Sequence, residues 1–84
     1  MLTKDQFDAM PVIVRVQKVF ESGVEIMSRT DKLHDIKLYA FSDFFVEIWY
    51  QKTINRIEKV ITQDLDEVIQ LYENQIDIHD LFKK

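Results

Sequence analysis

The chain has 84 residues, 46% of them hydrophobic, and 15 acidic against 11 basic residues give a formal net charge of −4. A chain of this length forms one small domain that buries about 60 to 65% of its unfolded surface, and the composition excludes a disordered or low-complexity chain. The absence of cysteine excludes disulfides, thiolate zinc sites and a cysteine nucleophile. We expect a single folded domain over residues 1–84, and the lack of cysteine fits a reducing cytoplasm.

The sequence carries no membrane signal. No apolar run approaches the roughly 18 residues of a membrane span, and residues 1–6 lack the basic start and apolar core of a signal peptide. The basic residues are scattered, which disfavours a general phosphate-binding surface. We expect a cytoplasmic protein without a membrane partner.

Two helical patterns occupy the first 22 residues. Thr3 and Gln6 form a capping-box pattern, which predicts a helix that begins near residue 4. In the next segment the valines also alternate as in a strand, but the helical period separates an apolar arc from a polar side better. The spacing predicts a helix over about residues 11–22, ended by Gly23 in the left-handed C′ conformation. Pro11 leaves open whether the two segments form one kinked helix or two. The apolar arc contains Val12, Ile13, Val16, Val19 and Phe20.

Four short β-rich runs follow, separated by connections of two or three residues. They cover residues 24–30, 34–41, 44–51 and 55–62. Connections this short predict an antiparallel meander. In the second run, even-numbered and odd-numbered side chains lie on opposite faces of the strand. We expect the even-numbered residues of the second and third runs to share one core face. These residues are Ile36, Leu38 and Ala40 in the second run, and Phe44, Val46, Ile48 and Tyr50 in the third.

A second helix is predicted after the strands. Asp64 followed by Glu67 is an N-terminal cap pattern, and the apolar residues after it have helical spacing over about residues 65–74. Residues 76–82 are again rich in apolar side chains, and we expect them to pack back on the domain. The complete pattern predicts an α+β domain with an N-terminal helix, a four-stranded antiparallel meander and a C-terminal helix.

Few residues suggest catalysis or metal binding. His34 and His79 each precede an aspartate, as in metal phosphohydrolases, but those enzymes need further ligands on an all-helical scaffold. No hydroxyl has a nucleophile motif around it, and a single glycine excludes a phosphate-cradling loop. We expect no catalytic residue, no metal and no cofactor.

One pair of carboxylates is an alternative. Glu47 and Glu58 lie on neighbouring predicted strands, where two acids can form a paired-carboxylate site. An ion pair of Glu47 with Lys37 or Lys59 across the strands is the simpler interpretation. We therefore do not expect an enzyme.

Residues 44–50 form the most informative stretch, because as a strand they place apolar side chains on both faces. On the face opposite the expected core, only Glu47 interrupts the aromatic residues. The first helix covers this face, or a protein partner does, since exposed aromatic surface is typical of interfaces. We expect protein contact, with a symmetric homodimer as the simplest form. The expected interface residues are Tyr39, Phe41, Phe45 and Trp49.

The alternative is a module for single-stranded nucleic acid. Bases stack on exposed rings of a sheet in such modules, and here Lys37, Arg56 and Lys59 would contact the phosphates. The acidic balance of the chain disfavours this function.

The run Leu38-Tyr39 followed by Asp43–Tyr50 resembles the "LY…DFFVEIWY" core of a family of small uncharacterised bacterial α+β proteins. The resemblance is clearest over residues 20–62. It implies a hairpin and a bacterial source, and it brings no activity, cofactor or functional residue.

Overall fold

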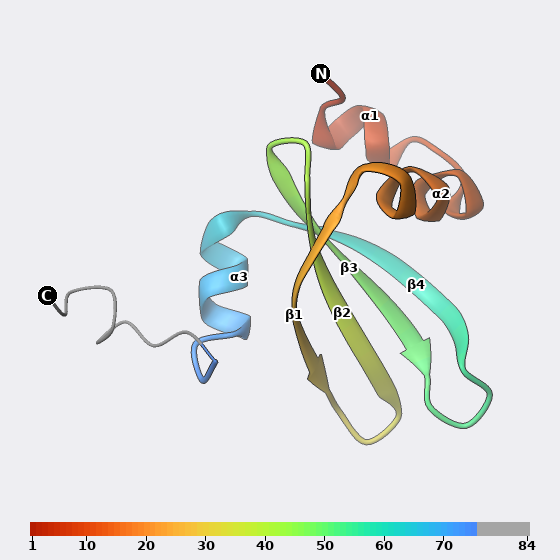
Figure 1. The fold of residues 1–84 in the computed structure, drawn as a ribbon, viewed down its shortest axis with the longest axis vertical. Helices are drawn as coiled ribbons and strands as arrows, with labels where there is room; N and C mark the ends of the chain where they lie inside the picture. Colours follow the sequence, from red (N-terminus) through yellow and green to blue (C-terminus); the bar gives the residue numbers. More distant parts are fainter. Residues whose placement is uncertain (76–84) are drawn as a thin grey trace, which may run out of the picture.

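The computed structural model describes residues 1–75, in which helices pack on both faces of a four-stranded sheet (Figure 1). The strands follow the order β1-β2-β3-β4, and each is antiparallel to the next. This confirms the predicted α+β meander between helices; the packing expected for residues 76–82 lies outside the described residues. The elements are α1 (Lys4–Asp8), α2 (Val12–Ser22), β1 (Val24–Thr30), β2 (His34–Phe41), β3 (Phe44–Gln51), β4 (Arg56–Gln63) and α3 (Leu65–Leu71).

The N-terminal segment forms two helices, not one kinked helix. The capping box at α1 is present: the Gln6 backbone N–H donates to Thr3 Oγ1 at 3.2 Å, and the Thr3 N–H donates to Gln6 Oε1 at 3.0 Å. Pro11 then has an extended ψ of 151° at the N-cap of α2. Proline lacks a backbone donor and suits a helix start, so the chain turns here and begins a new helix.

Gly23 ends α2 for a reason that differs from the prediction. Its φ is −83° and its ψ 157°, so the backbone is extended and not left-handed. A Cβ at this position would lie 2.6 Å from the Val19 carbonyl oxygen and 3.1 Å from Val19 Cγ1. Glycine is therefore needed for close approach to the last turn of α2 and not for a positive φ.

The register of β2 and β3 overturns the predicted face assignment. Tyr39 pairs with Val46 and Phe41 with Phe44, whereas Leu38 pairs with Glu47. Directly opposed residues share a face, and a turn of only two residues makes Phe41 oppose Phe44. Odd-numbered residues of β2 therefore share a face with even-numbered residues of β3, the reverse of the prediction.

The main core lies between the sheet and the two N-terminal helices. The Phe7 ring lies 5.2 Å from the Phe41 ring and 5.6 Å from the Phe44 ring, in tilted and edge-on arrangements that aromatic pairs prefer. Val19 of α2 packs on the same face. The buried members of this core are Phe7, Val19, Tyr39, Phe41, Phe44, Val46, Ile48 and Val60.

A second, smaller core lies on the opposite face, under α3. Leu38 of β2 packs there with Val68 and Tyr72, and Met27 and Phe45 lie against them. Figure 1 shows α3 on the other side of the sheet from α1 and α2. Each helical layer thus covers only part of one face, and apolar side chains of α2 and α3 remain exposed.

Candidate contact surfaces

A buried carboxylate lies at the centre of the α3 face. Glu47 has no exposed surface and accepts five hydrogen bonds from four residues. Arg29 binds both oxygens, with Nε 2.9 Å from Oε2 and Nη2 3.2 Å from Oε1. Tyr72 Oη lies 2.6 Å from Oε2, and Gln63 Nε2 and Trp49 Nε1 lie 3.1 and 3.2 Å from Oε1. The predicted pairing with Lys37 or Lys59 is therefore wrong, because Arg29 reaches Glu47 from β1.

These bonds decide the ionisation of the site. Burial alone would raise the pKa of Glu47, but the hydrogen bonds from Arg29, Tyr72 and Gln63 outweigh it, so that this pKa lies below its usual value. Burial, followed by the bond to Glu47, raises the pKa of the Tyr72 phenol. Glu47 is thus a charged acceptor that links β1, β3, β4 and the end of α3.

The paired-carboxylate site does not form. Glu58 binds His34 Nε2 at 2.7 Å and Gln51 Nε2 at 2.6 Å, whereas the oxygens of Glu47 are occupied by other donors. Among residues 1–75, no group of three or more His, Asp and Glu side chains is placed to hold a metal ion. His79 lies outside the described residues.

The four predicted interface rings lie on opposite faces of the sheet. Tyr39 and Phe41 are 8% and 7% exposed in the main core, so the predicted single face of four rings is wrong. Phe45 and Trp49 are half-buried on the opposite face, which α3 covers in part and the first helix does not. The cause is the hairpin register. A partner contact through Phe45 and Trp49 stays a prediction.

The surroundings of Trp49 also bear on the nucleic-acid alternative. Lys59 Nζ lies 4.0 Å from the centre of its ring, Arg29 Cζ lies 5.2 Å away, and the His34 ring lies 5.1 Å away. These contacts use ring surface on which a base would stack. Lys37 lies on the other face, opposite Ile48. The predicted platform of rings and cations is therefore not assembled on one face.

The α2 helix does not bury the whole of its apolar arc in the core, and several of these side chains face solvent. Val12, Ile13 and Phe20 are 45%, 70% and 55% exposed, and Val19 alone of the arc is fully buried. The physical reason is Arg15, which lies outside the apolar arc. Arg15 Nη1 donates to the Val60 carbonyl at 3.0 Å and Nε to the Met10 carbonyl at 3.1 Å. These bonds turn the Arg15 side of α2 toward β4 and leave part of the apolar arc facing away from the sheet.

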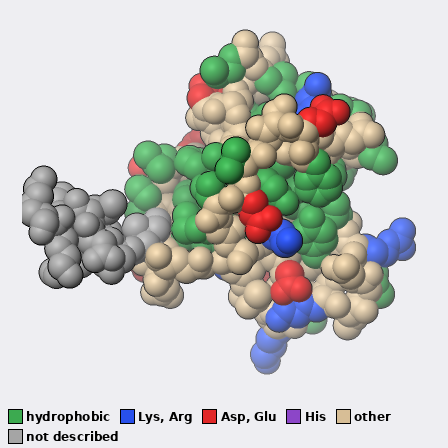
Figure 2. Space-filling view, viewed as in Figure 1, with side chains coloured by type: hydrophobic (Ala, Val, Ile, Leu, Met, Phe, Trp, Pro, Cys, Tyr) green, Lys and Arg blue, Asp and Glu red, His purple; other side chains and the backbone are tan. Residues whose placement is uncertain are grey.

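We call the part of this arc that is not fully buried, Val12, Ile13, Val16 and Phe20, the α2 stripe; Val12, Ile13 and Phe20 are exposed, and Val16 is half-buried against the main core. Its first three residues and Ile57 of β4 line a shallow groove of about 390 Å³. Phe20 continues the stripe, with its ring 6.2 Å from that of Tyr39. Figure 2 shows hydrophobic side chains exposed in the regions of α2 and α3. The stripe is thus an extended apolar surface that the described residues leave in large part uncovered.

The edges of the sheet are less suited to a partner. Both outer strands contain a bulge, at Ile26 in β1 and at Glu58 in β4. The Gln75 side chain donates to the Ser28 carbonyl at 2.5 Å, and Arg15 binds the β4 carbonyl described above. Bulges and side chains on the backbone of an edge strand hinder addition of another strand. Side-chain surfaces are therefore the better candidates for contact.

Comparison with known proteins adds no relative. No family model, curated protein or solved structure matches the chain, so the resemblance over residues 20–62 stays a prediction. No helix within residues 1–75 is long and apolar enough to cross a membrane.

Proposed function

We propose that the protein is a small, non-catalytic, cytoplasmic bacterial domain that acts by protein contact and forms a homodimer through the α2 stripe. The observation that carries this proposal is that α2 is amphipathic, yet turns much of its apolar side away from its own core. The lack of cysteine supports a reducing location. The full set of hydrogen bonds on Glu47 supports a structural and not a catalytic role for the most buried acid.

The size of the stripe fits a modest interface. An aromatic side chain has about 200 Å² of surface, so Phe20 at 55% exposure offers about 100 Å² and the whole stripe about 350 Å². Patches of about 300–600 Å² are the largest on a typical monomer and are often functional. Burial of the stripe in both copies would remove about 700 Å² from water, twice the area of one stripe, which is below the roughly 1,000 Å² of a stable interface and fits a weak, reversible dimer. We expect a dissociation constant on the order of micromolar.

The linear shape of the stripe favours a second copy as its partner. Val12 and Phe20 are separated by about 12 Å along the helix axis, at about 1.5 Å per residue. A two-fold axis beside Val16 makes two α2 helices antiparallel, and it places the Val12 end of one stripe against Phe20 of the other. Lys18 and Glu21 on the same helix have opposite charges, so pairing brings no cluster of like charge together.

Sedimentation velocity over about 1–100 μM, the range around the expected affinity, tests this proposal. Wild type should change from monomer to dimer, and the double variant Ile13→Glu/Phe20→Glu should remain monomeric with an unchanged circular dichroism spectrum. The matched control is Ile69→Glu on α3, since Ile69 is 43% exposed on the other side of the sheet. Trp49→Glu tests the face predicted from sequence, provided that its circular dichroism spectrum is unchanged, because Trp49 also donates a hydrogen bond to Glu47.

Two results would overturn the proposal. The first is a wild-type protein that remains monomeric over the whole range. The second is a dimer that tolerates charges at residues 13 and 20 but is lost in Trp49→Glu, which would move the interface to the α3 face.

A further inference from the structure

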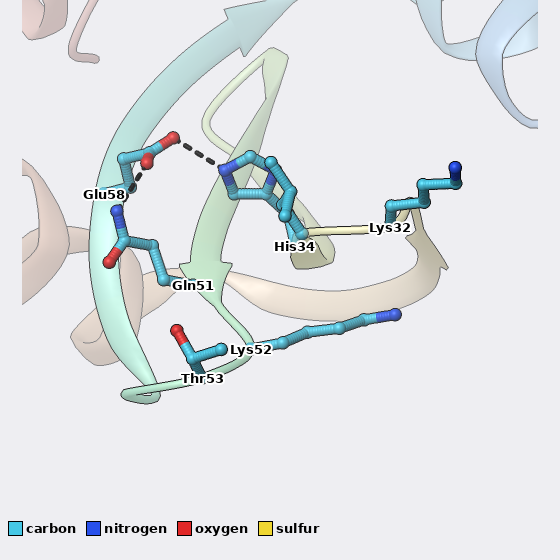
Figure 3. Close-up of a pocket in the computed structure, with 7 residues that line it drawn as sticks. Lys32, His34, Gln51, Lys52, Thr53 and Glu58 are labelled. Atoms are coloured by element: carbon cyan, nitrogen blue, oxygen red, sulfur yellow. Dashed lines mark hydrogen bonds and ion pairs between the residues drawn. The ribbon is translucent and has the colours of Figure 1, made fainter.

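The hairpin end of the sheet carries a second surface that self-association does not use. There the β1–β2 turn and the β3–β4 turn lie together, joined by a hydrogen bond of 2.9 Å from the Lys52 N–H to the Leu33 carbonyl. Between them is a hollow of about 230 Å³, lined by side chains of both turns and of β4. Figure 3 shows Lys32 and Lys52 extending toward the same side of this hollow.

The base of the hollow is held by a polar network. His34 Nδ1 lies 3.1 Å from Asp31 Oδ1, and Nε2 lies 2.7 Å from Glu58 Oε2. Asp31 also accepts the backbone N–H groups of Leu33 and His34, at 2.8 and 2.7 Å. Gln51 completes the network by donating to Glu58 (Figure 3). Two of the acids at this end are therefore committed to internal bonds, and the turns are fixed before any ligand arrives.

The charge of this end differs from that of the rest of the chain. Residues 29–37 and 49–59 contain six basic and three acidic residues, whereas the remaining residues up to 75 contain three basic and ten acidic ones. Lys32 and Lys52 are exposed and make no ion pair with residues 1–75. A net acidic protein thus has one basic end, and such a field orients an approaching acidic partner.

Two exposed aliphatic side chains lie on the same two turns as Lys32 and Lys52. Leu33 and Ile54, one from each turn, are 68% and 55% exposed. Exposed aliphatic groups beside unpaired cations are suited to a ligand that has both carboxylates and an apolar side chain. The absence of a free aromatic ring among the residues lining the hollow disfavours nucleic acid, which binds by base stacking.

We propose that the hairpin end is a binding site for an acidic segment of another protein, with the carboxylates of the segment between Lys32 and Lys52. The hollow receives an aliphatic side chain of the segment against Leu33, and Ile54, exposed on the other turn outside the lining of the hollow, offers a second apolar contact. The hollow between the two turns is concave and can enclose a peptide side chain. A flat lipid surface would instead require both turns to insert together as one convex wedge, so the geometry favours a peptide. This site is separate from the α2 stripe, so both can be occupied at once.

Trp49 provides the readout, because it is the single tryptophan and its ring contacts His34, which lines the hollow. The probe is an acetylated peptide of glutamate and leucine, titrated into the full chain at low and high salt. The matched probe has glutamine in place of every glutamate. We expect saturable binding of the acidic peptide that weakens with salt, and no binding of the glutamine peptide.

Charge-reversal variants locate the site. Lys32→Glu/Lys52→Glu should raise the dissociation constant by about tenfold or more, as expected for the loss of two charge contacts. The control Lys4→Glu/Lys18→Glu makes the same change in net charge at the other end of the molecule and should leave the constant within about twofold. Because Lys32 and Lys52 bind no described side chain, Lys32→Glu/Lys52→Glu should keep the wild-type circular dichroism spectrum; the control removes the exposed ion pair of Lys4 with Asp64, so its spectrum is measured as well. Ile13→Glu/Phe20→Glu should bind the peptide normally, even if dimer formation is lost.

Several outcomes would overturn this inference. They are absence of peptide binding at low salt, equal binding of the glutamine peptide, and equal loss in the two charge-reversal variants. Tighter binding through Lys32 and Lys52 of phosphatidylserine vesicles, or of a single-stranded oligonucleotide, would replace the protein segment by a lipid surface or a nucleic acid.

Discussion

Replacing Glu47 by glutamine should destabilise the fold more than any other change of similar size. The two Glu47 oxygens accept five hydrogen bonds. In a glutamine, one of these oxygens becomes an NH₂ group, which is itself a donor and cannot accept a bond from the N–H and O–H groups around it. The change also leaves Arg29, whose side chain is 24% exposed, without its counter-charge. Breaking a buried ion pair from one side costs about 3–5 kcal/mol. A domain of this length has a total stability of about 4–13 kcal/mol, so a large part of it would be lost.

Urea unfolding followed by circular dichroism and Trp49 fluorescence measures this loss. Tyr72→Phe removes only the 2.6 Å bond to Glu47 and should cost about 1.5–3 kcal/mol, as for a bond to a charged group. Glu21→Gln, an exposed acid on α2, should change stability by less than about 0.5 kcal/mol. The expected order is Glu47→Gln, then Tyr72→Phe, then Glu21→Gln. A Glu47→Gln variant within about 1 kcal/mol of wild type would refute the assignment of Glu47 as the stabilising centre.

The buried Glu47 carboxylate also predicts how the stability of the fold depends on pH in the acidic range. The pKa of Glu47 is lower in the folded than in the unfolded state, so the unfolded chain takes up its proton first as pH falls. The contribution of Glu47 is complete above the unfolded pKa, about 4.3, and is lost as pH falls through the lower folded value. Urea midpoints should therefore be constant from neutral pH to about 5 and fall below it. In Glu47→Gln this decline should be smaller, and an identical decline would exclude Glu47 as its source.

The remaining predictions concern alkaline pH and backbone geometry. Burial, and then the bond to Glu47, raises the pKa of Tyr72 in the folded state. The contribution of Tyr72 to stability is therefore complete below about pH 10 and is lost as pH rises toward the folded pKa. Tyr72→Phe should remove this loss. Gly23→Ala should lower the free energy of unfolding by about 1–3 kcal/mol in urea, because its Cβ would clash with the Val19 carbonyl; an unchanged midpoint would show that α2 shifts freely. Asn55 has a φ of 52°, so Asn55→Ala should cost about 1 kcal/mol and Asn55→Gly should cost less, and equal losses would contradict this reasoning.

The elements could be predicted because their signals are local. Three of the four strand ranges agree with the structure residue for residue, and β4 is displaced by one residue, to Arg56–Gln63. The capping boxes at Thr3 and Asp64 are both present. α3 ends at Leu71, earlier than the apolar spacing predicted, and Tyr72 after it binds Glu47.

The sequence did contain a signal for the correct face assignment of β2 and β3. A connection of only two residues between Phe41 and Phe44 makes these residues oppose each other, and this fixes the register of the hairpin. Ser42, with a φ of 57°, occupies this turn. Turn length decides which residues share a face, whereas matching apolar sets between strands does not.

Other features depend on tertiary contacts that the sequence pattern does not contain. The rotation of α2 follows from a bond between Arg15 and the Val60 carbonyl, 45 residues later in the chain. Arg29, the ion-pair partner of Glu47, lies on β1, and the long Arg29 side chain reaches across to Glu47 on β3. One signal for this pair was present, since an acid within a two-sided apolar strand needs a cation when it is buried, and arginine is the residue best suited to that role.

The two faces of β3 differ in what completes them, and this difference explains why α2 and not Trp49 provides the proposed dimer surface. On the α3 side, a helix of seven residues is too short to be stable alone, so Val68 and the bond from Tyr72 to Glu47 hold it on the sheet. Around Trp49, a partner would compete with the contacts of this ring to Lys59 and His34 and with its hydrogen bond to Glu47, although Leu65, Ile69 and Leu71 of α3 are also exposed. On the α2 side the core is complete with Val19, and the residues beyond it remain apolar and exposed. A partner gains contact area there without disturbing a buried group, which makes α2 the less costly surface for association.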